Sequence, residues 1–178
     1  LGKRIAYKIM AAIGGSSLKL GYTMAITDLI VAPATPSNTA RGGGILFPIV
    51  RSLCSAFKSE PDNGAKRIGS YLMSSTFQGN CITSSMFITS VAPNSLCVAL
   101  AAQAIGVQMT WGSWALACIV PGLIALALCP YLVYKINPPE LKNTPEAQEL
   151  AREELKNMGA MKSDEKTVLA VFILALAL

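Results

Sequence analysis

The dominant pattern in the chain is an apolar tract without a single charged side chain. Between Arg67 and Lys135, 67 consecutive residues contain no Asp, Glu, Lys, Arg or His. A membrane-spanning helix needs about 20 mostly apolar residues, so the tract has room for two spans and a short turn. The pattern predicts that this part of the chain lies in a membrane.

The composition of the whole chain supports the same prediction. Hydrophobic residues make up 52% of the chain and charged residues only 14%, whereas a soluble domain carries about 25% charged residues. The formal charge of +5 would suit nucleic acid, but the basic residues are dispersed and are not interleaved with aromatic side chains. We therefore expect the lipid bilayer, and no nucleic acid, as a partner.

The basic residues indicate the topology, because they lie in three short segments that flank the apolar stretches. By the positive-inside rule, such segments stay on the cytoplasmic side or its equivalent, so all three are expected at one face of the membrane. The segments contain Lys3, Arg4, Lys8 and Lys19, then Lys58, Lys66 and Arg67, and finally Lys135, Lys142, Arg152, Lys156, Lys162 and Lys166.

A re-entrant hairpin is predicted over residues 20–57. Its two apolar arms, 24–36 and 45–57, have 13 residues each, which is too short to span a bilayer. They lie between the first two basic segments, so the chain must enter and leave the membrane by one face. The polar tip at 37–44 is expected to be irregular, and such backbone survives in a membrane only inside protein or beside a wet cavity. The tip is therefore a candidate site.

A broken helix is predicted over residues 68–105. Pro93 lacks a backbone donor and clashes with the preceding turn, so we expect helices at 69–88 and 95–105 with the break between them. Broken helices expose unpaired backbone groups at membrane depth, where many secondary carriers bind ions and substrates.

The first half of this broken helix has a polar face. Thr76, Asn80 and Thr83 follow the spacing of one helical face, which we expect to look into protein or water. Polar side chains of this kind also join helices to one another in membranes. Helix-to-helix contact and contact with the candidate site are therefore both open interpretations.

The rest of the chain is expected to alternate turns, spans and connectors. Trp111 and Trp114 are read as interfacial aromatics, and Thr144 with Pro145 as the cap and first residue of a helix. Both ends are expected to lie inside a longer chain. The expected segments are an amphipathic segment at 1–19, a linker at 58–67, an external turn at 106–112, a span at 113–135, an amphipathic connector at 136–166 and the start of a truncated span at 167–178.

Catalytic and metal chemistry finds little support in the sequence. The five cysteines form no C-x-x-C pair and the chain has no histidine, so no zinc site is expected. An intramembrane enzyme using Cys81 or a serine as nucleophile would lack an evident base. We expect neither an enzyme nor a cofactor, and a non-transporting membrane scaffold is a separate alternative.

Four short motifs occur in an order that resembles one family. They are Pro36-Ser37-Asn38-Thr39-Ala40-Arg41, Thr83-Ser84-Ser85-Met86-Phe87-Ile88-Thr89, Ala92-Pro93-Asn94 and Pro138-Pro139-Glu140. In this order the chain resembles the divalent anion:sodium symporter family, and within it the branch of 2-oxoglutarate/malate translocators and citrate/succinate or tartrate/succinate antiporters. The S-N-T triplet alone is weakly specific, and its combination with the A-P-N break is what carries the resemblance.

The resemblance implies an all-α, polytopic transporter fragment with inverted-repeat architecture. Each repeat would supply one re-entrant hairpin and one broken transmembrane helix, and the single S-N-T here would form half of a site for a C4 or C5 dicarboxylate. It further implies elevator movement against a dimeric scaffold, in a bacterial inner membrane or a plastid inner envelope. The substrate-binding residues that it implies are Ser37, Asn38, Thr39, Arg41, Thr89 and Asn94.

The resemblance leaves two coupling modes open. A weak sodium site would use Ser37, Asn38 and the backbone of Pro93. Sodium-coupled members often carry a serine one turn before the tip, where this chain has Pro33, and Arg41 adds a cation nearby. Fewer oxygen ligands and a neighbouring cation weaken a cation site. Exchange of one dicarboxylate for another is therefore favoured, with sodium-coupled symport as the alternative.

Two charged residues lie close to the hairpin tip in sequence. An arginine at membrane depth is a functional hypothesis by default, so Arg41 either attracts substrate or locks the tip through backbone carbonyls. Asp28 lies nine residues before Ser37, or roughly 13 Å at helical rise. We therefore expect Asp28 nearer the hairpin base, in a structural role.

Overall fold

The computed structural model describes the backbone of residues 1–177, and the side chains of these residues apart from Phe172 and 175–177. The described residues form helices joined by turns and by two longer connections, at 57–68 and 137–144, and they include no β-strand. In chain order the helices are α1 (Gly2–Ile13), α2 (Ser17–Val31), η1 (Ala32–Ala34), α3 (Asn38–Arg41), η2 (Gly42–Leu46), α4 (Phe47–Ala56), α5 (Gly69–Met86), η3 (Ile88–Ser90), α6 (Ala92–Ile105), α7 (Trp111–Ile136), α8 (Pro145–Met158) and α9 (Ser163–Ala177).

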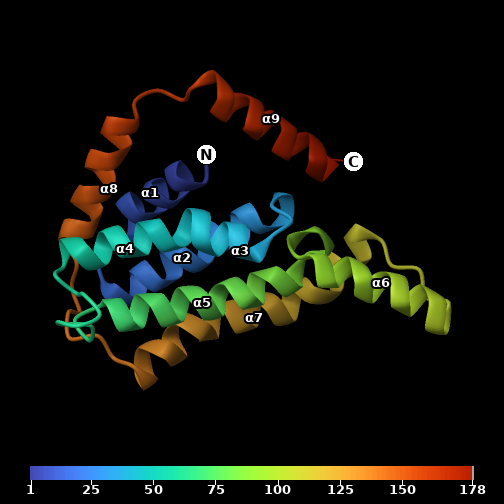
Figure 1. Cartoon of the computed structure of the whole chain (residues 1–178), viewed down its shortest axis with the longest axis horizontal. Helices are drawn as coiled ribbons and strands as arrows, with labels where there is room; N and C mark the ends of the chain where they lie inside the picture. Colours follow the sequence, from blue (N-terminus) through green and yellow to red (C-terminus); the bar gives the residue numbers. More distant parts are fainter. Residues whose placement is uncertain (178) are drawn as a thin grey trace.

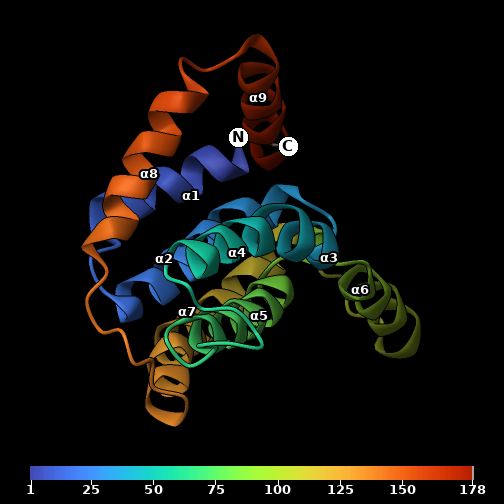
Figure 2. The same cartoon turned by 60° about the vertical axis from the view of Figure 1, so that its left-hand side comes forward.

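Four helices lie side by side and form the body of the structure. Helix α5 packs on α7, α2 and α4, and α2 also contacts α7 (Figure 1). Helix α1 packs on α2 and α8 at one end of this bundle. Helix α6 extends away from the bundle at the other end, as Figure 1 and Figure 2 both show. The fold is thus all-α, as the sequence predicts.

Helix α7 is the one described helix that is long and apolar enough to cross a membrane. Its 26 residues correspond to about 39 Å at helical rise, more than the roughly 30 Å of a hydrocarbon core. A capping box between Thr110 and Ser113 begins the helix. Trp111 and Trp114 therefore belong to the first turn of α7, and the expectation that Trp111 lies in the preceding external turn is wrong.

The broken helix has its interruption before the proline. Helix α5 ends at Met86, the turn η3 follows, and α6 already begins at Ala92. Pro93 therefore occupies the first turn of α6, where a missing backbone N–H costs no hydrogen bond. The expectation that Pro93 and Asn94 form the break is wrong, because proline starts a helix more readily than it interrupts one.

The second arm of the hairpin is helical from the tip onward. Helix α3 begins at Asn38 and runs through a π-helical turn, η2, into α4. Pro48 explains the π turn, because its ring would clash with the carbonyl four residues earlier in a regular α-helix. The Phe47 N–H donates instead to the Gly42 carbonyl. The expectation of an irregular tip at 37–44 is wrong, and the non-helical segment shrinks to residues 35–37.

The connector is tied to the start of the chain. Helix α8 begins at Pro145 as expected, but the Thr144 side chain makes no cap hydrogen bond. Its hydroxyl donates to the Gly14 carbonyl at 3.1 Å instead. Ala147 and Ala151 are fully buried where α8 packs on α1. The amphipathic segment expected at 1–19 and the amphipathic connector expected at 136–166 thus pack against each other through α1 and α8.

Arg4 joins this pair to α9. Its guanidinium donates to the Gly159 carbonyl at 2.8 Å and to both Glu165 carboxylate oxygens at 3.2 and 2.8 Å. The pKa of Glu165 falls to about 2, mainly because Arg4 donates to it and also because the Lys162 N–H does. Gly159 has φ of +60°, which permits the turn between α8 and α9.

A glycine notch positions α2 against α5. Tyr71 on α5 is 1% exposed, and its ring lies against the bare Cα of Gly21 on α2. A Cβ added at Gly21 would overlap the Tyr71 hydroxyl and lie 2.9 Å from its Cζ atom. The close approach of the two helices therefore depends on glycine at this position.

We predict that Gly21→Ala destabilises the complete natural protein by about 1–3 kcal/mol, the usual cost of overpacking a dense interface. Thermal unfolding in detergent should show a lowered Tm. Gly79→Ala on α5 is the matched control, because its Cβ would lie 3.9 Å from its nearest neighbours, in Ala25 and Leu126. Equal Tm values for the two variants would contradict the claim that the approach of α2 to α5 depends on glycine at position 21.

Candidate functional site: the hairpin tip and the helix break

A buried ion pair lies beneath the hairpin tip. The Arg41 Nε atom donates to Asp28 Oδ1 at 3.0 Å, and the two side chains are 0% and 1% exposed. Arg41 is one helical turn down the second arm, which brings it level with Asp28 on α2. The expectation that Asp28 lies nearer the hairpin base is therefore wrong, because the tip is short and both arms are helical.

The rest of the Arg41 guanidinium bonds to the tip and to the helix break. Its Nη1 atom donates to the carbonyls of Thr35 at 2.9 Å and Ser90 at 2.8 Å. Its Nη2 atom donates to the Ser84 hydroxyl at 2.7 Å. One side chain thus holds the first arm, the tip and the break together.

The second carboxylate oxygen of Asp28 also has hydrogen-bond partners. It accepts hydrogen bonds from Asn80 Nδ2 at 2.9 Å and from the Thr83 hydroxyl. Two members of the polar face of α5 therefore serve as helix-to-helix contacts. The third, Thr76, has a hydroxyl without a partner among the described residues.

The tip itself begins the helical second arm. Ser37 has extended backbone angles and its hydroxyl accepts the Ala40 N–H at 3.2 Å, which is the geometry of a helix N-cap. Asn38 Oδ1 accepts the Thr39 N–H at 2.9 Å. The Asn38 Nδ2 atom donates to no partner in the described part of the chain, and Thr39 is exposed. The tip therefore presents polar groups and a helix N-terminus outward.

Hydrogen bonds from side chains hold the helix break in place. Asn94 Nδ2 donates to the carbonyls of Ser84 and Phe87 at 2.7 and 2.8 Å, and the Ser90 hydroxyl donates to the same two carbonyls at the end of α5. The Thr89 hydroxyl donates to the Pro33 carbonyl in the first hairpin arm. These bonds place the break directly against the base of the tip.

The tryptophans at the start of α7 complete the support. Trp111 Nε1 donates to the Thr89 hydroxyl at 3.2 Å, and Trp114 Nε1 donates to the Ser85 carbonyl at 3.0 Å. The Trp111 ring stacks on Phe87 with 5.9 Å between centroids. The two tryptophans, each with one indole N–H donor, are the signal in the sequence that could have indicated these contacts.

The six residues that the resemblance implies for substrate binding come together in one region. Ser37, Asn38 and Thr39 lie at the tip, Arg41 lies beneath it, and Thr89 and Asn94 lie in and after the adjoining break. The polar side-chain atoms of Arg41, Thr89 and Asn94 already donate within the protein, which matches the locking role considered for Arg41. Their contact with substrate stays a prediction.

Apart from hydroxyl and carbonyl oxygens, the described residues offer few groups that could bind a metal ion. The described residues contain no group of three or more His, Cys, Asp or Glu side chains that could hold a metal. The Ser37 hydroxyl is engaged as a cap, and the carbonyl of Pro93 belongs to the first turn of α6. The predicted sodium contacts of Ser37, Asn38 and Pro93 stay a prediction.

Comparison with known proteins gives one family. The family described as the sodium:sulfate symporter transmembrane region matches residues 1–178. The putative malate transporter YflS of Bacillus subtilis is 50% identical over 179 residues. Dicarboxylate transporter 1 of the Arabidopsis thaliana chloroplast is 44% identical over 179 residues, and the citrate/succinate antiporter of Escherichia coli K12 is 41% identical over the same length.

Each of these alignments covers all of this chain and 37%, 32% and 37% of the respective relative. The chain thus spans about a third of the length of these curated relatives. The match over its full length confirms the family that the S-N-T and A-P-N motifs indicate. The chain is part of an integral membrane protein and belongs to the sodium:sulfate symporter transmembrane family.

Proposed function

We propose that the chain supplies half of the binding site of a secondary carrier for C4 or C5 dicarboxylates, which crosses the membrane several times. The observation that carries this proposal is the hairpin tip, whose polar groups and helix N-terminus are presented beside a helix break. The relatives named above are described as transporters of malate or dicarboxylates and as a citrate/succinate antiporter, which supports the substrate class.

The chemistry of the tip suits a carboxylate. The Asn38 amide and the Thr39 hydroxyl are hydrogen-bond donors, and the N-terminus of a helix favours negative charge. Asp28 and Arg41 neutralise each other below the tip, so the tip offers neutral donors. A carrier must bind its cargo weakly enough to release it, and neutral donors meet that need better than a fixed charge.

Exchange of dicarboxylates is the coupling mode that the residues favour. A sodium ion needs several free oxygen ligands, and at this tip the Ser37 hydroxyl is a helix cap and position 33 is proline. The carboxylate of Asp28 below the tip is already paired with Arg41, so it is not free to attract or bind a sodium ion. The donor set therefore fits sodium poorly, and sodium-coupled symport is the second candidate.

The proposal extends to the whole protein. The missing half of the site would come from a second hairpin and a second broken helix in an inverted repeat. The unit made of hairpin and break would move as an elevator against a dimeric scaffold. The hydrogen bonds of Arg41 and Thr89 between the hairpin and the break support movement of the two as one body.

We predict that Asn38→Ala in the complete protein weakens dicarboxylate binding roughly tenfold to hundredfold, because a hydrogen bond to a charged group contributes about 1.5–3 kcal/mol. Uptake of radiolabelled malate into liposomes measures the effect. Asn157→Ala on the exposed side of α8 is the matched control. Unchanged uptake by Asn38→Ala, with normal thermal unfolding, would contradict the site and favour a non-transporting scaffold.

Counterflow in liposomes distinguishes the two coupling modes. We predict that uptake requires dicarboxylate inside the vesicles and is the same in sodium and potassium buffers, because the tip lacks a fitted sodium site. Empty vesicles should take up little substrate. Uptake into empty vesicles that depends on a sodium gradient would contradict exchange and establish symport.

A further inference from the structure

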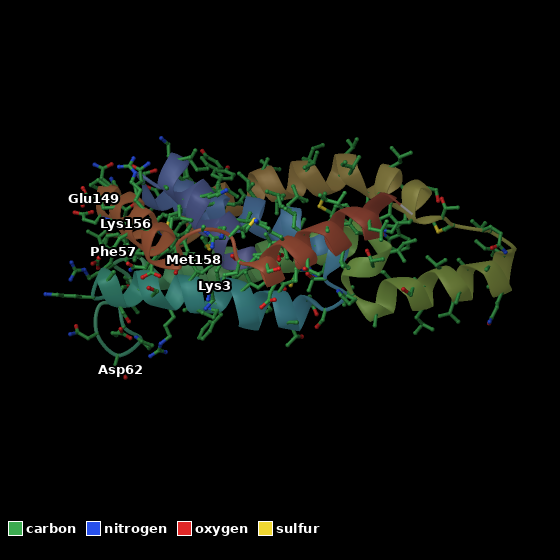
Figure 3. All side chains as sticks on the ribbon, turned by 90° about the horizontal axis from the view of Figure 1, so that it is seen from above. Lys3, Phe57, Asp62, Glu149, Lys156 and Met158 are labelled. Carbon is green, nitrogen blue, oxygen red and sulfur yellow. The ribbon has the colours of Figure 1, made fainter. Side chains whose placement is uncertain are left out.

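A second candidate site lies at the end of the bundle opposite the hairpin tip. A cavity of about 410 Å³ lies between the linker that follows α4 and the connector that leads into α8. Helix α4 runs from the tip to this end (Figure 1), and Phe57 lies there beside α8 (Figure 3). The cavity is lined by residues that include Phe57, Lys58, Arg67, Leu141, Glu146 and Leu150.

Hydrogen bonds fix the segments that form the walls of this cavity. The Glu140 and Leu141 N–H groups donate to the carbonyls of Lys66 and Arg67, both at 3.0 Å. The buried Ser59 hydroxyl donates to the Gly64 carbonyl at 2.8 Å and accepts the Gly69 N–H at 2.9 Å. The linker and the connector are thus fixed against each other.

The cavity carries an excess of positive charge. Lys58 and Arg67 line it, and neither forms an ion pair with another described residue, since the three observed ion pairs involve Leu1, Arg4 and Arg41. Glu146 also lines the cavity and carries the opposing charge. The two cations and one carboxylate leave a net charge of about +1, which suits an anion with a single negative charge.

The Lys58 backbone is held in an unusual conformation. Its φ is +51°, and it is the one non-glycine residue with positive φ in the described chain. Such a conformation costs free energy in an ordinary residue and persists only where the surroundings impose it. Lys58 is therefore held at the cavity edge by the turn that follows α4.

The position along the chain points to the membrane surface. The apolar helix α7 ends at Ile136, five residues before Leu141, and all three basic segments of the sequence are expected at this face. Phe57, Leu141 and Leu150 give the same cavity apolar walls. Cations beside apolar walls at this depth match the phosphate and the acyl chains of an anionic phospholipid.

We propose that this cavity binds one anionic phospholipid, with the headgroup phosphate at Lys58 and Arg67 and the acyl chains against the apolar walls. The site goes beyond the proposed transport function and does not depend on it. Free phosphate and the dicarboxylate cargo share the same charge chemistry, and the experiment below separates them from the lipid.

Native mass spectrometry of the complete protein tests the proposal. The protein is purified with mixed phosphatidylglycerol and phosphatidylcholine, and the retained lipid is counted. We expect a preference for phosphatidylglycerol that falls about fivefold for each of Lys58→Gln and Arg67→Gln, the usual contribution of one cation near an anionic lipid. Lys156→Gln, an exposed cation on α8 that does not line the cavity, is the matched control and should retain the preference.

Glu146→Gln provides a test of opposite sign. Removing the carboxylate from the cavity should raise the preference for phosphatidylglycerol, whereas a merely structural defect would not. Inorganic phosphate, malate and soluble glycerophosphoglycerol should fail to displace the lipid at matched concentrations, because they lack acyl chains. Equal retention by wild type and by Lys58→Gln/Arg67→Gln, or displacement of the lipid by any of the three soluble anions, would overturn the proposal.

Discussion

The buried pair of Asp28 and Arg41 is the interaction on which the arrangement of the candidate site depends. Taking two charges out of water is costly, and the cost is offset only where every polar atom finds a partner. Here both carboxylate oxygens accept hydrogen bonds, and the guanidinium bonds to the carboxylate, to two backbone carbonyls and to Ser84. Losing either partner would leave an uncompensated charge, so the pair specifies one arrangement of tip and break.

This constraint has a direct consequence for the chemistry of the tip. The two buried charges beneath Asn38 and Thr39 are already paired with each other, so the tip itself presents neutral hydrogen-bond donors. A neutral, donor-rich surface can hold a carboxylate reversibly. The same pair makes the hairpin and the broken helix one mechanical unit, which an elevator movement would require.

The sequence predicts the large features because they depend on composition and period. The position of the hairpin and the long apolar helix α7 can be predicted from the lengths of the apolar runs, because a bilayer sets the length that a spanning helix needs. The chargeless tract is the longest of these runs. The family resemblance follows from motifs that are contiguous. These features need no knowledge of which segments touch.

The details that the sequence does not predict depend on contacts between distant residues. Pro93 starts α6 instead of breaking α5, because a proline in a first turn loses no hydrogen bond. Pro48 produces the π turn of the second arm, which brings more of the polar stretch into the helix. Thr144 bonds to Gly14 instead of capping α8. Asp28 meets Arg41 because the non-helical turn at 35–37 is only three residues long, a length that hydropathy alone does not give.

The distance between the tip and the broken helix reports whether the buried pair holds the two together. The natural cysteines of the complete protein are replaced, and spin labels are attached at Thr39 and Ser95. Pulsed electron paramagnetic resonance then measures the distance between the two labels. We expect one narrow distribution in the otherwise native protein and a broad one in Asp28→Asn, where Arg41 loses its charged partner. An equally narrow and unshifted distribution in Asp28→Asn would show that the buried pair does not hold the site together.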